Sequence, residues 1–517
     1  MRRLVVAITA LLVALMGAVV GGYLLLFSAS ADRAARAVPD DAAVYVNVYL
    51  QPSAGQQLNL FGLLGQLRGF GDPAALGEKI DEVAQRLLGQ ARIDYAADLR
   101  PWLGAQVAVA AAPAVGGGAL QLLVLAAVKD AAAARAALPR VFASIGLTLT
   151  KETYRGHEVM TGQAASYALL DGLLVVANTP ERLRAAIDAD ADVAPSLADR
   201  PEFAAAMRQV ASDHLASVWV DLPGLAGLGR GTLLGGYGAA ALAVTAEADG
   251  LHLGGTAIFD ARAASNDARA AFKLGVETSS LAAWMPRTTS AELSLFGLAQ
   301  SFADLEAALS ADAAFRPAAD ALNQLRAIAS LGLGINIDRD LLPLFDGEAA
   351  LAIERVAADG PHGDLILHPA DSAAAHQGLE RVRSALASRG SQTSAQPVAG
   401  TSVTTIVVPG IGSVAYAELD GVVLIGLDAD DVAAALEAHA AGTTLASDGR
   451  YGRPFELAGG RAGNEVWADL ASLADGLAGI FDLGSELRDI LHQIGELAIS
   501  ASVNDDRLEI NGVLTLR

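Results

Sequence analysis

The aspartates after one predicted helix form the most metal-like pattern in the chain: Asp188, Asp190 and Asp192, followed by Asp199. Oxygen ligands at positions 1, 3, 5 and 12 of a segment are typical of a calcium-binding loop. The sixth position, however, is Val193, where the sharp turn of such a loop needs glycine. We therefore interpret the segment as the solvated end of a helix and predict no calcium site there.

Three histidines, His362, His368 and His376, lie close together in the sequence, with Asp364 and Asp371 between them. A zinc site needs three or four converging ligands, and spacings such as HExxH that place them on one helix face are absent. The chain also contains no cysteine, which excludes thiolate ligands, disulfides and thiol catalysis. The sequence predicts no metal site.

Motifs for phosphate binding and acyl transfer are incomplete as well. The glycine-rich residues 223–238 have neither the GxxxxGK[ST] nor the GxGxxG spacing. Residues 143–146 lack the first glycine of the G-x-S-x-G nucleophile elbow. We therefore predict no cofactor and no catalytic residue, and we expect the protein not to be an enzyme.

A tryptophan and an aspartate recur as a pair, Trp219 with Asp221 in VWVDL and Trp467 with Asp469 in VWADL. On a strand, both side chains of a pair point to the same face. One interpretation is a packed tryptophan beside an aspartate that caps the next helix. The other is a pair that faces a groove between two units of the chain. These four residues are the candidate binding residues, and both interpretations remain open.

The segments around these pairs also occur twice, in the same order. SYALLDGLLVVAN at 166–178 recurs as AYAELDGVVLIGL at 415–427, and the proline-led strand near 44–50 recurs near 292–298. The intervals between corresponding landmarks lie between 241 and 249 residues, which predicts an internal duplication. In each copy, Asp-Gly between apolar runs predicts a hairpin with a type I′ turn.

Strands and helices in mixed order, with frequent hairpins, favour an α+β fold with largely antiparallel sheets. We expect a cytoplasmic stub, transmembrane helix and short linker in residues 1–37, and a first α+β unit in 38–262. A connector in 263–283 would lead to a second, homologous α+β unit in 284–517.

The apolar segment Leu4–Phe27 carries no charge and is long enough to cross a bilayer as a helix. Arg2 and Arg3 favour a cytoplasmic N-terminus, which would place the rest of the chain outside the cytoplasmic membrane as a single-pass protein. The alternative is secretion after cleavage following Ala31, because Ala29-Ser30-Ala31 has the small-x-small form of a processing site.

A formal charge of −22 at pH 7 argues against nucleic acid as a partner, since binders of nucleic acid carry basic surfaces. The bulk of such a chain would be repelled by anionic polymers and attracted to cationic groups.

Several consecutive segments resemble one bacterial family, the domain of unknown function 3352 family. They are DYAADLRPWLG at 94–104, KETYRGHEV at 151–159, the Asp-Gly hairpin, and SLADRPEF at 196–203 leading to VWVDL at 218–222. The resemblance implies a membrane-anchored envelope protein without an established biochemical role. The second unit departs from the pattern, since Leu344 stands where the first unit has Trp102, and the tyrosine of YRG is lost.

Together these observations predict a membrane-anchored, extracytoplasmic protein of the cell envelope that acts by binding or scaffolding, with an envelope protein as partner. An extracytoplasmic hydrolase remains an alternative, as does a binder of apolar or cationic ligands that uses a cleft between the two units.

Overall fold

The computed structural model describes residues 32–67, 85, 93–113, 120–226, 236–311, 316–357, 360–409, 412–478, 488, 492–504 and 506–517. The predicted anchor Leu4–Phe27 and its processing site lie outside these residues. Within the described ranges, no helix is both long and apolar enough to cross a bilayer. Within the described residues, helices and strands are mixed and the paired strands run antiparallel, which confirms the α+β class.

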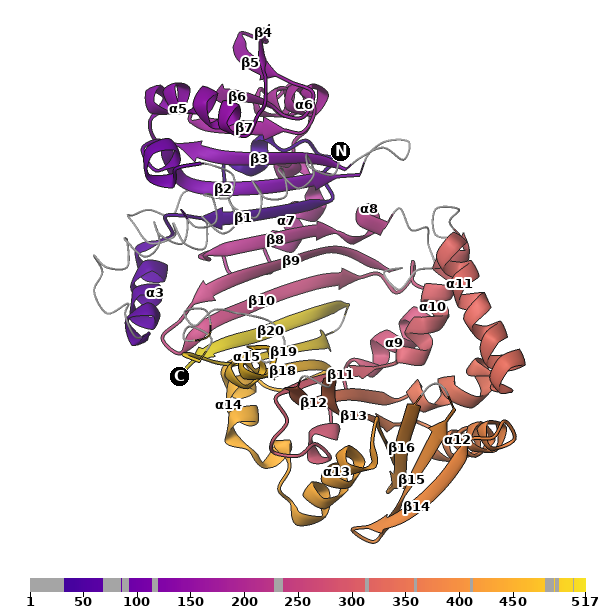
Figure 1. Ribbon diagram of the computed structural model, residues 1–517. Coiled ribbons are helices and arrows are strands. Elements are labelled where there is room, and N and C mark those ends of the chain that lie inside the picture. Colours follow the sequence, from indigo (N-terminus) through magenta and orange to yellow (C-terminus); the bar gives the residue numbers. More distant parts are fainter. Residues whose placement is uncertain are drawn as a thin grey trace. The chain divides into compact units, whose positions relative to one another are not determined.

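The chain divides into two compact units, Met1–Gly227 with Gly238–Ile258, and Leu228–Tyr237 with Phe259–Arg517. Figure 1 labels their elements. The helical elements of the first part of the chain are α2 (Ala34–Ala37), α3 (Ala54–Gln66), the π-helix η1 (Tyr95–Leu99), α5 (Ala131–Ser144), α6 (Pro180–Asp190), the 3-10 helix η2 (Leu197–Asp199), α7 (Pro201–Met207) and α8 (Leu222–Ala226). Its strands are β1 (Val44–Tyr49), β2 (Leu103–Ala112), β3 (Gln121–Val128), β4 (Thr150–Tyr154), β5 (His157–Thr161), β6 (Ser166–Leu170), β7 (Leu173–Ala177), β8 (Ala216–Asp221), β9 (Tyr237–Ala246) and β10 (Gly250–Phe259).

These strands form one sheet in the order β4-β5-β6-β7-β3-β2-β1-β8-β9-β10 (Figure 1). Apolar side chains cover both faces. On one face, Leu183 of α6 and Phe203 of α7 belong to the same buried cluster as Trp219 of β8. On the other face, Leu138 and Phe142 of α5 belong to a second cluster. The sheet is therefore the middle layer of the first unit.

The second unit has its own set of elements after residue 259. Its helical elements are α9 (Asn266–Leu274), η3 (Leu281–Ala283), α10 (Leu298–Ala311), α11 (Arg316–Ala327), the π-helices η4 (Ile328–Leu333) and η5 (Ile337–Leu341), η6 (Leu342–Phe345), α12 (Ser372–Ala387), α13 (Ala429–Ala441), η7 (Leu445–Ser447), α14 (Gly449–Leu457) and α15 (Leu470–Ala478). Its strands are β11 (Ala291–Phe296), β12 (Glu348–Ala357), β13 (Gly360–His368), β14 (Gln392–Val398), β15 (Thr401–Val408), β16 (Gly412–Leu419), β17 (Val422–Gly426), β18 (Asn464–Asp469), β19 (Ile494–Asn504) and β20 (Arg507–Leu516).

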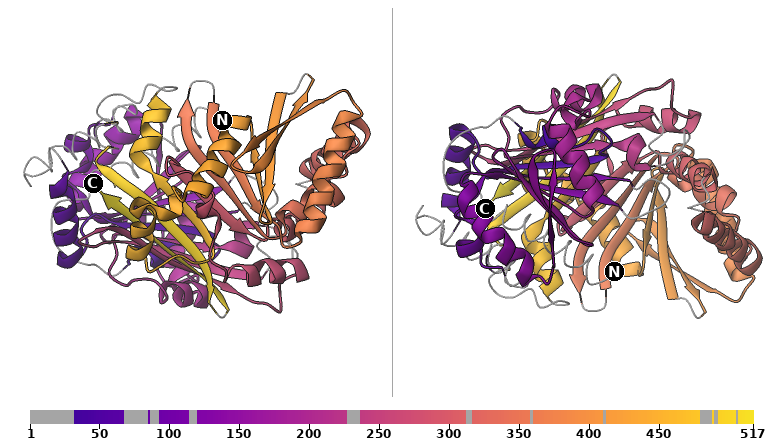
Figure 2. Two further views of the ribbon diagram at one scale, coloured as in Figure 1. Left: turned by 90° about the horizontal axis from the view of Figure 1, so that it is seen from below. Right: turned by 90° about the horizontal axis from the view of Figure 1, so that it is seen from above.

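The strand order in the second unit is β14-β15-β16-β17-β13-β12-β11-β18-β19-β20. Leu436 of α13 and Phe455 of α14 share a buried cluster with Trp467, while Leu379 of α12 lies in a cluster on the other face. In both views of Figure 2 the strands of this unit fan out, as expected from the right-handed twist of strands. The order of strand pairing matches that of the first unit.

Local sequence signals explain where several helices begin. Asp130 accepts hydrogen bonds from the N–H groups of Ala132 and Ala133 at 2.9 and 3.0 Å, and thereby caps α5. Thr179 caps α6 through the N–H of Arg182 at 3.1 Å, with proline in the first helical position. Short polar side chains at these positions satisfy backbone donors that no helical carbonyl can reach. The local sequence thus accounts for both helix starts.

The two Asp-Gly hairpins differ from each other. Asp420 and Gly421 have φ angles of 50° and 83°, as a type I′ turn requires. In the first unit only Gly172 has a positive φ, of 72°, so the predicted type I′ turn at Asp171 is wrong. The N–H of Val128 donates to the carbonyl of Gly172 at 2.9 Å, and this bond to β3 holds the turn in another conformation.

Candidate functional site

The recurring tryptophans lie inside their own units. Trp219 on β8 is fully buried, and Phe203 packs against it with ring centroids 5.5 Å apart. The guanidinium of Arg200 lies 5.1 Å from the Trp219 ring and donates to Asp221 at 2.9 Å. Asp221 also accepts from the N–H of Gly224 at 3.1 Å, at the start of α8. Trp219 is thus packed inside its unit, and Asp221 caps the start of α8.

The second pair is arranged in the same way, but its aspartate has two arginine partners. Trp467 on β18 is fully buried, and the buried Asp469 accepts from the N–H of Ser472 at 3.2 Å. Arg450 and Arg517 donate to the two oxygens of Asp469 at 2.9 and 2.5 Å. Burial alone would raise the pKa of Asp469, but the hydrogen bonds from Ser472 and Arg517 hold it below its ordinary value. The groove between the units stays a prediction for all four residues.

The other sequence candidates lie apart from one another. Asp188 accepts from the Tyr154 hydroxyl at 3.0 Å and pairs with Arg155, while Asp199 accepts from Ser196. Hydrogen bonds from Ser196 lower the pKa of Asp199. Asp188 and Asp199 are therefore bonded to neighbouring groups within the first unit.

A polar network in the first unit, the first polar cluster, consists of the half-buried Asp32 and the buried Tyr45, Asn47, Gln106 and Ser217. Asp32 accepts from the Tyr45 hydroxyl at 2.7 Å and from the Gln106 amide at 2.6 Å. The same amide donates to Asn47 at 2.9 Å. Burial, together with the neighbouring Asp32, raises the pKa of Tyr45 well above its ordinary value. One carboxylate is thus held by neutral donors.

A corresponding network in the second unit, the second polar cluster, consists of Ser279, Glu292, Ser294, Glu348, Tyr451, Arg461 and Glu465. Glu465, 0% exposed, accepts from the Tyr451 hydroxyl at 3.0 Å and from Arg461 at 2.7 and 3.0 Å. Glu292, 2% exposed, accepts from Ser294 at 2.6 Å. Burial raises the pKa of Glu292 to about 7, and the charge of Glu465 adds to the shift.

Strand register shows that the two clusters occupy corresponding places. Tyr45 pairs with Trp219 on the neighbouring strand, as Glu292 pairs with Trp467. Asn47 pairs with Ser217. In the second unit, Ser294 pairs with Glu465 in the same way. Glu348 pairs with Phe296 as Gln106 pairs with Tyr49, so Glu348 and Gln106 occupy corresponding positions. The second unit therefore puts three carboxylates where the first has neutral groups.

Sequence reasoning missed a third group, which we call the His362 site: His362 and Asp364 on β13, Glu354 on β12, and Asp428 and Asp431 at the start of α13. One possible ligand atom from each of His362, Asp428 and Asp431 lies within 4.8 Å of the others. Asp364 is 1% exposed, and neither of its carboxylate oxygens has a hydrogen-bond partner.

The charged residues of the His362 site affect one another electrostatically. Burial, together with the charges of Glu354, Asp431 and Asp428, raises the pKa of Asp364 to about 8. His362 lies 3.6 Å from Asp431, whereas His376 pairs with Glu418 at 2.9 Å. The histidine run of the sequence therefore does not form one ligand set. The missed signal was Asp364 itself, a charge inside the apolar strand GDLILH.

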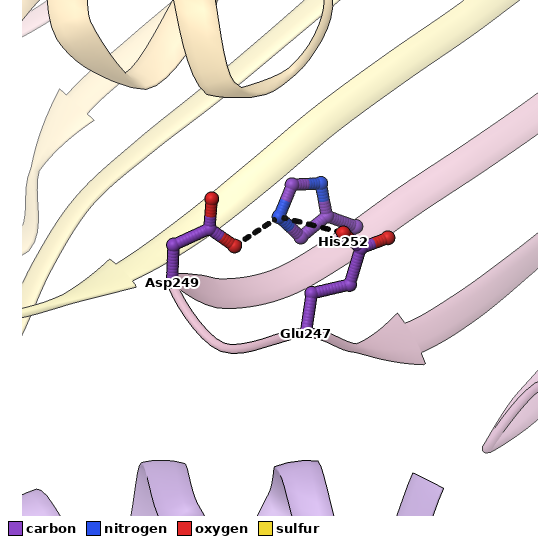
Figure 3. A group of neighbouring side chains, drawn as sticks. All are labelled: Glu247, Asp249 and His252. Atoms are coloured by element: carbon purple, nitrogen blue, oxygen red, sulfur yellow. Dashed lines mark hydrogen bonds and ion pairs between the residues drawn. The ribbon is translucent and has the colours of Figure 1, made fainter. Parts of the chain in front are cut away.

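A second histidine–carboxylate group lies on the β9–β10 hairpin of the first unit. Figure 3 shows His252 between Asp249 and Glu247, with its Nε2 atom 2.8 Å from Asp249 and 4.0 Å from Glu247. Both carboxylates are exposed to solvent. Solvent can satisfy these groups without an ion, in contrast to Asp364.

The profile of the family described as "Protein of unknown function (DUF3352)" matches residues 4–516. No curated protein matches the chain. Among solved structures, crystal form III of TP0453 is similar, with 13% identity and a TM-score of 0.26, over 45% of this chain and 82% of that one. Crystal form IV of TP0453 gives 14% identity and a TM-score of 0.26, over 44% and 81% of the two chains.

Proposed function

This chain belongs to the DUF3352 family, and we propose that it is a membrane-anchored, non-enzymatic protein of the bacterial cell envelope. Leu4–Phe27 would cross the cytoplasmic membrane once, and both α+β units would lie outside it, where they bind or hold an envelope protein.

The observation that carries the proposal is the position of Asp32. Its carboxylate is bonded to Tyr45 and Gln106 in the first polar cluster, so Asp32 is part of the folded first unit. Only four residues separate Phe27 from Asp32, and the five Cα–Cα steps between them span at most about 18 Å when fully extended. An uncleaved anchor would therefore hold the first unit close to the membrane surface, as a scaffolding role requires.

The burial of a strongly perturbed carboxyl group supports a non-enzymatic role. A pKa near 7, as at Glu292, suits general acid–base catalysis and often marks an active site. Glu292, however, lies in the core of its unit and is only 2% exposed, and its neighbour Glu465 is 0% exposed. A substrate cannot reach either group without unfolding part of the core.

We also infer that the units, with the boundaries 38–262 and 284–517, arose by duplication. Besides the common order of strand pairing, Pro39 bridges Ser196 as Pro286 bridges Thr444. The inference would be tested by aligning separate profiles of the two halves across the family. Failure of the halves to align in register would contradict it.

Localisation is the first test of the proposed function. We expect the full chain to stay in the membrane fraction after carbonate washing, and its bulk to be digested by protease added outside the cytoplasmic membrane. A mature N-terminus at Asp32 would contradict the anchor and favour the secreted alternative.

Partner capture is the second test, done by crosslinking the full chain in its own membranes. The matched control inserts about ten glycine and serine residues between Ala31 and Asp32, which lengthens the tether without altering the fold. We expect specific crosslinks in the native chain and weaker ones in the extended chain. Recovery of no partner above background with either chain would contradict the scaffolding role.

A further inference from the structure

The two units place opposite charges at one corresponding position. Arg182 is the third residue after Thr179, which caps α6, and Asp431 is the third residue after Asp428, which caps α13. Arg182 is 2% exposed, and its Nη1 atom donates to Asp41 at 2.5 Å. The first unit therefore buries a cation of its own at this place.

The second unit gathers carboxylates at the same place. Asp364 pairs with Gly426 in the ladder, as Leu123 pairs with Ala177 in the first unit, so an apolar side chain has been exchanged for a charge. A Cβ atom at Gly426 would lie 2.8 Å from Asp364 Oδ1. The glycine thus leaves room for this carboxylate beside the strand that leads to Asp428.

Buried carboxylates without partners are strongly unfavourable unless they take up a proton or a cation compensates them. Both oxygens of Asp364 and Oε1 of Glu354 have no hydrogen-bond partner. The N–H groups of Asp430 and Asp431 donate to Asp428, which fixes this carboxylate at the start of α13. Geometry and charge both favour a cation among these groups.

We propose that the His362 site binds one divalent transition-metal ion, with His362, Asp428 and Asp431 as ligands and Asp364 as the buried carboxylate beneath them. An imidazole with carboxylates suits Zn²⁺ or Mn²⁺, whereas Ca²⁺ and Mg²⁺ prefer oxygen ligands alone. The side chains of His362 and Asp431 are 17% and 12% exposed, which gives an ion a path from solvent. The ion would take the place that Arg182 fills in the first unit.

The test is calorimetric titration of the chelator-treated full chain in detergent with ZnCl₂, MnCl₂, MgCl₂ or CaCl₂. We expect one Zn²⁺ per chain, weaker binding of Mn²⁺, and still weaker binding of Mg²⁺ and Ca²⁺. His362→Gln and Asp364→Asn should each weaken Zn²⁺ binding at least tenfold. The matched control, His252→Gln, alters the exposed group of Figure 3 and should leave the affinity unchanged.

A second variant copies the first unit. Asp431→Arg supplies the cation covalently, so it should abolish Zn²⁺ binding and raise the Tm of the metal-free chain. Absence of stoichiometric Zn²⁺ binding to the native chain would overturn the proposal. So would an affinity that is unchanged in His362→Gln and Asp364→Asn, with native circular dichroism confirming that these variants fold.

Discussion

Opposite Trp219, the first unit places the hydroxyl of Tyr45, and opposite Trp467 the second places the carboxyl of Glu292. Around Tyr45 one carboxylate is satisfied by neutral donors, whereas around Glu292 three carboxylates share the cationic Arg461 and a few hydroxyl groups. Corresponding positions of the two sheets thus hold either one carboxylate with neutral donors or several carboxylates with a cation. The second depends on charge balance, and its stability should respond to loss of the cation and to pH.

The largest effect should come from removing the cation of the second polar cluster. Arg461→Met keeps the aliphatic stem beside Tyr451 but leaves Glu465 buried and without its ion pair. Breaking a buried ion pair typically costs about 3–5 kcal/mol, and we expect a loss of unfolding free energy of about this size in urea denaturation.

The matched control for this variant is Arg184→Met in the first unit, where Arg184 pairs with Glu152 at the surface at 3.1 Å. Exposed pairs contribute about 0–1 kcal/mol, so its loss should be much smaller. Equal losses in the two variants would show that Glu465 does not depend on Arg461.

The next largest effect should be the dependence of the free energy of unfolding on pH that Glu292 causes. Its pKa is about 7 in the folded chain and near the ordinary 4.5 when unfolded, so the folded state keeps the proton as pH rises between these values. The free energy of unfolding should therefore fall by about 3 kcal/mol from pH 4.5 to 7. Glu292→Gln should remove this fall and be the more stable chain at pH 8.

Denaturation of both chains at several pH values measures this difference. Glu158→Gln, at an exposed carboxylate of the first unit, serves as the control and should keep the native pH profile. Parallel profiles of the native chain and Glu292→Gln between pH 4.5 and 7 would contradict the assignment.

The smallest effect should come from the neutral donors of the first polar cluster. Tyr45→Phe removes one hydrogen bond to Asp32 and leaves the one from Gln106 in place. We expect the free energy of unfolding to fall by about 1–2 kcal/mol. Tyr154→Phe removes a similar bond to Asp188, but Tyr154 lies nearer the surface than Tyr45, and Asp188 keeps its bond from Arg155. The loss in Tyr154→Phe should therefore be smaller, and an equal loss would show that burial of the Tyr45 hydroxyl is unimportant.

The local parts of the fold were predictable from the sequence. Asp130 and Thr179 cap helices through neighbours two or three residues away, and the Asp-Gly hairpins join adjacent strands. The turn at Asp171 was mispredicted because a bond from β3, distant in sequence, also acts on it. Short-range chemistry fixes such elements unless the tertiary structure intervenes.

The polar clusters were not predictable because their members come from distant strands. Glu292, Glu348 and Glu465 lie on β11, β12 and β18, and each by itself resembles an ordinary charged residue in an alternating strand. The His362 site likewise joins β13 to the start of α13. Only comparison of aligned positions, such as Asp431 with Arg182, carries a signal in the sequence.

The strand order has a consequence for association. Among the described strands, β4 pairs with β5 alone and β14 with β15 alone, so each is an edge strand. β4 carries Lys151 and Glu152 with largely exposed side chains, and β14 is polar and contains Pro397. Charges and proline on an edge discourage the addition of further strands, which protects the sheet against aggregation. A partner of the kind proposed here would have to recognise side chains rather than extend the sheet at these edges.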